Sequence, residues 1–88
     1  MCTMIVEKTN IQGSGKGNKG WFKLSQANVF FDHPTHLHMD YSINIDFIDT
    51  TQKESKRIAI ELTPDSAKNL IDTILKSLKK GSSMGLKI

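Results

Sequence analysis

Residues 36–47 alternate between apolar and polar side chains without an exception. This period of two predicts an extended strand with one buried face and one solvent face, as in an antiparallel sheet. Twelve residues is long for one strand, so the first few are also compatible with a loop. The odd positions are Leu37, Met39, Tyr41, Ile43, Ile45 and Phe47, and the even positions are His36, His38, Asp40, Ser42, Asn44 and Asp46.

Three other segments, 2–9, 21–32 and 57–62, have the composition of strands. The glycine-rich stretch 10–20 between the first two predicts a loop. In 21–32 the apolar side chains change from even to odd positions, which predicts a bulge or bend near Ser25. Strands 36–47 and 57–62 are expected to form a hairpin.

A helix is predicted from Pro64 to about residue 80, since Thr63 can cap it and Gly81 can end it. The predicted fold is α+β: a four-stranded, mainly antiparallel sheet in the order β-β-β-β-α, with the C-terminal helix packed on one face. Residues 1–80 form one domain and 81–88 a tail. The helix carries apolar residues at helical spacing, namely Ala67, Leu70, Ile71, Ile74, Leu75 and Leu78.

The stretch FDHPTHLHMD, residues 31–40, concentrates three histidines and two aspartates around a proline. Pro34 favours a tight turn over 33–36, and an extended chain beyond it would place His36, His38 and Asp40 on one side. Imidazole and carboxylate groups are the ligands of zinc, so these residues are the candidate divalent-metal site. The candidate ligands are His33, His36, His38, Asp32 and Asp40, with Asn44 and Asp46 placed to orient a ligand.

The same residues also fit a structural interpretation. A solvated sheet face is polar without any function, Asp46 can pair with Arg57 across the hairpin, and His33 or Asp32 can cap a turn. Cys2 is a similar case: as an N-terminal residue after methionine removal it could be a nucleophile or a further metal ligand. The alternative for Cys2 is a packed thiol at the end of a strand.

GSGKG, residues 13–17, lacks the G-x-x-x-x-G-K-[ST] spacing of a phosphate loop, and a strand follows it instead of a helix. A nucleoside triphosphatase is therefore excluded. A weaker possibility is an anion or nucleotide site in which glycine amides and Lys16 act beside Trp21. The alternative is a flexible hairpin loop.

The chain has 88 residues and a formal net charge of +3, with one arginine, Arg57. Arginine supplies most bidentate contacts to bases, so this balance argues against nucleic-acid recognition. A single cysteine and the lack of a long apolar run are typical of a cytoplasmic protein without a membrane span. A core this small predicts a homo-oligomer, most simply a dimer.

The combination of MCTMIVEKT, GSGKG before GWF, ANVFFDHP and NIDF resembles a family of small prokaryotic proteins of unknown function. The resemblance covers most of the chain and implies no activity or catalytic residue.

Three functions follow from these patterns. The first is binding of zinc, another divalent metal or a small anionic ligand by the segment 32–40; if the protein is an enzyme, metal-assisted hydrolysis or proton transfer is expected there. The second is binding of a nucleotide or single-stranded nucleic acid by the loop 13–20 and Trp21. The third is a structural or interaction domain with no small-ligand site.

Overall fold

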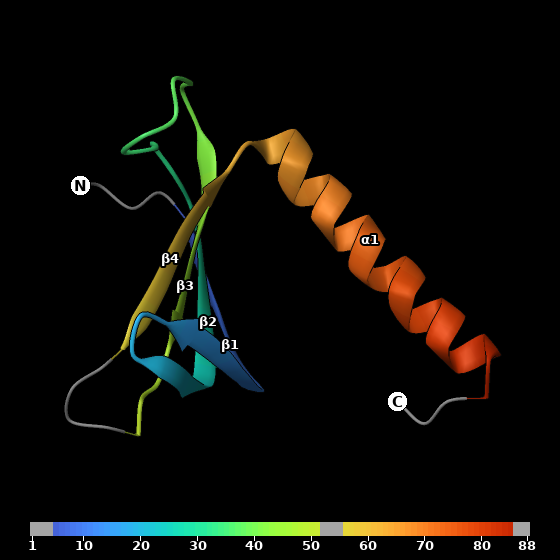
Figure 1. The fold of residues 1–88 in the computed structure, drawn as a ribbon. Helices are drawn as coiled ribbons and strands as arrows, with labels where there is room; N and C mark the ends of the chain where they lie inside the picture. Colours follow the sequence, from blue (N-terminus) through green and yellow to red (C-terminus); the bar gives the residue numbers. More distant parts are fainter. Residues whose placement is uncertain (1–4, 52–55, 86–88) are drawn as a thin grey trace.

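The computed structural model describes residues 5–51 and 56–85. Four strands and one helix follow one another along the chain: β1 (Ile5–Gly17), β2 (Gly20–Asp32), β3 (Ser42–Ile48), β4 (Arg57–Leu62) and α1 (Pro64–Ser83). The strands form a single antiparallel sheet in the order β1-β2-β3-β4. The predicted α+β class and element order are therefore confirmed (Figure 1).

The register places the apolar side chains of the central and fourth strands on one face of the sheet. Val29 lies beside Ile45, and Ile45 lies beside Ile60. All members of this row are half-buried. We call it the apolar sheet face: Val29, Phe31, Ile43, Ile45, Phe47, Ile58, Ile60 and Leu62.

The hairpin of β1 and β2 is longer than the sequence predicts. The glycine-rich stretch is not a loop, because β1 continues through it to Gly17 and a turn at Asn18 and Lys19 joins the strands. Gly20 takes a φ of 105° after that turn, a conformation that glycine adopts without strain. The ladder is irregular between Asn10 and Gly13, opposite Ser25, where the change of apolar parity predicts it; the extra residue lies in β1.

The end of this hairpin curls over the sheet toward β4 (Figure 1). A side chain built on Gly15 of β1 would meet the Cδ1 atom of Ile58 at 2.6 Å, and Leu24 lies beside it. Strands at opposite edges of the sheet therefore meet at this end. Leu24 and Ala27 are the two buried hydrophobic residues in the described part of the chain, so the core lies under the curled hairpin.

The helix begins as predicted. Thr63 is its N-cap, with its hydroxyl accepting a 3.1 Å hydrogen bond from the Ser66 amide, and Pro64 is the first helical residue. The predicted end is wrong, because Gly81 lies within the helix. The chain leaves the helix at Met84 and Gly85, where Gly85 has a φ of 77°.

The helix does not cover the sheet as the sequence predicts. It approaches β3 and β4 only near its N-terminus and then runs away from the sheet (Figure 1). None of its residues is buried. Its apolar stripe is open to solvent, with Ile71 and Leu75 exposed by 56% and 58%. Within the described residues, the helix stripe therefore lacks a covering layer, and the apolar sheet face is covered where the curled hairpin reaches Ile58 but is only half-buried elsewhere.

Candidate functional site

The histidine segment is a loop rather than the start of a strand. β3 begins at Ser42, and residues 33–41 form a series of bends between β2 and β3. The predicted strand is therefore absent over 36–41, where the loop alternative is correct, and it begins at Ser42. Odd and even positions do not define two faces in this loop, so the alternation places His36, His38 and Asp40 on no common side.

His33 is held by the loop itself. Its Nδ1 atom lies 2.9 Å from the Asp40 carbonyl oxygen, and its ring stacks on Tyr41 at 5.4 Å between ring centroids. Tyr41 stacks in turn on Phe31 of β2 at 5.5 Å. Because a carbonyl oxygen only accepts, Nδ1 carries the hydrogen and donates to it, which leaves Nε2 as the acceptor atom of the ring.

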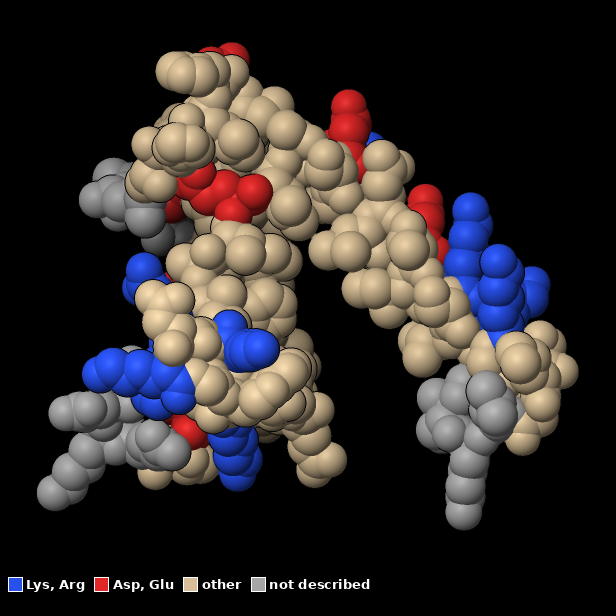
Figure 2. Space-filling view, in the orientation of Figure 1, with Lys and Arg blue, Asp and Glu red and all other residues tan. Residues whose placement is uncertain are grey.

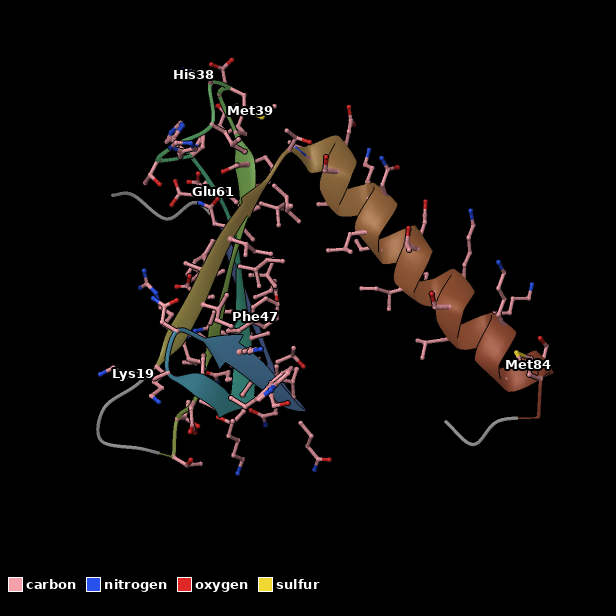
Figure 3. The ribbon with its side chains drawn as sticks, in the orientation of Figure 1. Lys19, His38, Met39, Phe47, Glu61 and Met84 are labelled. Carbon is pink, nitrogen blue, oxygen red and sulfur yellow. The ribbon has the colours of Figure 1, made fainter. Side chains whose placement is uncertain are left out.

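The three histidines occupy different positions along this loop. His38 lies at the tip of the loop next to Met39 (Figure 3). Within residues 5–51 and 56–85, no group of three or more His, Cys, Asp or Glu side chains is arranged to hold a metal ion. The candidate ligands His33, His36, His38, Asp32 and Asp40 therefore do not form such a group among these residues. Cys2 lies outside the described residues.

Glu61 of β4 anchors the loop. Its Oε2 atom accepts hydrogen bonds from the amide and hydroxyl of Thr35, at 2.5 and 2.8 Å, and its Oε1 accepts one from the His36 amide at 3.1 Å. These donors favour the ionised carboxylate, and the Thr35 amide has the largest effect in lowering the pKa of Glu61. The sequence assigns Glu61 only to the polar side of its strand, because its partners lie far away along the chain.

We expect Glu61→Gln to loosen the loop without unfolding the sheet, because a neutral amide accepts these hydrogen bonds more weakly than a carboxylate. Since the pKa in the fold lies below the ordinary value of about 4.3, the wild-type anchor is fully present above that value and is lost as the pH falls through the lowered pKa. The protection of the Thr35 and His36 amides against hydrogen exchange, measured between pH 6 and 3, should fall with pH in the wild type. It should show no such fall in Glu61→Gln. Equal exchange in both proteins would contradict the anchor.

Asp32 ends β2 inside the protein, with no exposed surface. Its Oδ1 accepts a 2.7 Å hydrogen bond from the His33 amide, whereas its buried Oδ2 has no hydrogen-bond partner. Nearby, the Ser42 hydroxyl donates to Asn44 Oδ1 at 2.7 Å. Asn44 is therefore engaged within the protein, and Asp32 Oδ2 is the unsatisfied atom of this segment.

Asp46 and Arg57 pair across the hairpin at 3.8 Å, as the structural interpretation predicts. They border a shallow depression of about 190 Å³ on the polar face of the sheet, which also includes Phe30, Asn44 and Glu61. Since Arg57 is largely exposed, this ion pair contributes little to stability. Polar side chains of this depression already contact each other, as in the Asp46–Arg57 ion pair and the Thr35–Glu61 hydrogen bond.

Lys16 and Trp21 are opposite residues near the turn of the curled hairpin. Trp21 is 68% exposed. A second depression of about 190 Å³ lies under the turn, between Lys19, Phe22 and Lys56, and the Lys56 ammonium lies 5.6 Å from the centre of the Phe22 ring. Lysines and aromatic rings thus gather at this end of the sheet.

The helix surface has two different sides. The side toward the sheet carries the apolar stripe, and lysines gather on the outer side (Figure 2). The apolar periodicity of the sequence predicts this stripe, but it does not predict which surface covers the stripe. Among the described residues, no helix is both long and apolar enough to cross a membrane.

The family comparison matches the chain over nearly its whole length. The model of a family described as "Family of unknown function (DUF6295)" covers residues 1–87. The chain belongs to this family. Its members share no assigned activity that could be carried to these residues. Neither the curated proteins nor the solved structures gave a match.

Proposed function

We propose that this member of the family is an interaction domain, which binds another polypeptide through the apolar stripe of α1 and the apolar sheet face. The observation that carries the proposal is the exposure of the stripe. Five large apolar side chains on one side of the helix are open to solvent: Leu70, Ile71, Ile74, Leu75 and Leu78. A contiguous apolar surface of this kind marks a binding surface, since leaving it in water is unfavourable.

The charge distribution supports a protein partner. The helix lysines lie on the outer side, away from the stripe (Figure 2). The helix stripe itself therefore carries no charged side chain that must lose its hydration. An amphipathic helix that presents such a stripe is a common element of protein–protein recognition.

The test is a pair of lysine substitutions on opposite sides of the helix. Leu75→Lys places a charge in the stripe and should abolish association measured by light scattering. Asn69→Lys adds the same charge on the other side and should leave association unchanged. At a concentration where the wild type is monomeric, Leu75→Lys should change the free energy of unfolding by less than about 0.5 kcal/mol. If the wild-type chain associates and Leu75→Lys associates equally well, the proposal is contradicted.

Binding of a divalent cation by the segment 32–40 is the second candidate, and the unpartnered, fully buried Asp32 Oδ2 favours it. The loop would have to rearrange to bring His33 Nε2 and a further ligand to that oxygen. This candidate predicts that untagged protein retains close to one zinc per chain, and that His33→Ala removes it. Retention below about a tenth of an equivalent by elemental analysis, with no uptake on titration, would exclude it.

A further inference from the structure

The helix stripe and the apolar sheet face lie opposite each other across an open space. The helix stripe points toward the sheet, and the space-filling view shows the separation between the two (Figures 2 and 3). Phe47 of the apolar sheet face lies on the side that looks toward the helix (Figure 3). One chain therefore presents both an apolar helix and an apolar sheet that would fit it, so that two copies are complementary to each other.

The single chain is more open than a typical folded monomer of its size. Its accessible surface is 7161 Å², whereas a globular monomer of 9.9 kDa exposes about 5,200 Å². Its radius of gyration is 15.0 Å, against about 12 Å for a compact chain of this length. Half of the excess surface would already exceed the ~800 Å² that each partner buries in a standard interface.

The connection between β4 and α1 opposes closure of the helix onto its own sheet. Only Thr63 lies between Leu62 and Pro64. Its φ and ψ are −63° and 152°, in the extended region to which a following proline restricts a residue. Its hydroxyl also caps the helix, so a change in its backbone angles would disturb the cap. A partner chain can fill the space without moving this connection.

We propose that the occupant is a second copy of this chain. In the resulting two-fold dimer, the two helices lie side by side between the two apolar sheet faces, and the helix stripe of each chain is buried against the other chain. This inference rests on the proposed function and names its partner. It also gives a physical reason for the small core of the single chain: the larger part of the core is shared.

The experiment measures the mass of the protein in solution and the accessibility of thiols introduced on the two sides of the helix. Wild-type protein at micromolar concentration should have twice the 9.9 kDa mass of one chain by light scattering. Leu75→Lys should raise the dissociation constant at least about 100-fold, because the two-fold axis places the change in the interface twice. Asn69→Lys should leave it unchanged. In a Cys2→Ser background, the thiol introduced by Leu75→Cys should react with a maleimide more slowly than the one introduced by Asn69→Cys.

The alternatives give different results. A monomeric mass with equal thiol reaction at the two positions would overturn the dimer and leave the interaction domain in place, with the stripe free for a different polypeptide. A monomeric mass with a protected Leu75→Cys thiol would mean that the helix closes on its own sheet. This result would overturn both the dimer and the interaction domain. A dimer that Leu75→Lys does not weaken would place the interface elsewhere and overturn the inference.

Discussion

Ile45→Asp is expected to unfold the protein. Ile45 lies in the middle of β3 between Val29 and Ile60, within the apolar sheet face. An aspartate there has no cationic partner on this face and must either bury its charge or disrupt the row. Such a change costs several kcal/mol, which is comparable with the whole stability of about 4–13 kcal/mol expected for a chain of this length. Circular dichroism and urea denaturation would measure the loss.

The matched control is Ala59→Asp. Ala59 lies on β4, exposed on the opposite face of the same sheet. The new carboxylate would remain in water and meet only mild repulsion from Asp46, so the free energy of unfolding should fall by less than about 1 kcal/mol. A folded Ile45→Asp protein with a wild-type melting curve would show that the sheet face has been assigned wrongly.

Leu24→Ala should cause the second large loss of stability. Leu24 is 8% exposed and packs where Gly15 of β1 meets Ile58 of β4. Removing a buried leucine side chain costs about 2–5 kcal/mol, part of it from the cavity left behind. The loss should appear in the urea midpoint with little change in the slope of the transition.

Trp21→Ala provides the control in the same hairpin. Trp21 is large and apolar, but its side chain is mostly in solvent. Its removal should change the free energy of unfolding by about 0.5 kcal/mol or less. If Trp21→Ala were the more damaging substitution, the hairpin would not curl over the sheet as described.

The sequence predicts the strands well wherever their neighbours are near in the chain. The apolar periodicity identifies β3 from Ser42, the whole of β4 and the start of α1, because each depends on local patterning or capping. It fails at residues 36–41. There the alternation continues, yet Glu61 holds the backbone of Thr35 and His36 in a loop. A contact between residues so far apart leaves no periodic signal.

Contacts between residues far apart in the chain also explain two other differences between the predicted and the observed structure. Glycines in 13–17 are typical of a loop, but Gly15 lies in β1, at a position where the close approach of Ile58 leaves no room for a side chain. The helix stripe predicts a covering surface without specifying which one. The sequence therefore predicts the amphipathic helix and not its separation from the sheet. For the candidate metal ligands, local clustering could not predict how the side chains would point.

The most direct test of the account is an isotope-filtered nuclear Overhauser experiment on a mixture of labelled and unlabelled chains. The proposed dimer predicts contacts between the methyl groups of Ile74 and Leu75 in one chain and the Phe47 or Ile45 side chains of the other. Such cross-chain contacts should disappear in Leu75→Lys and persist in Asn69→Lys. Contacts between these groups only within a single chain would show a helix packed on its own sheet and would contradict the account.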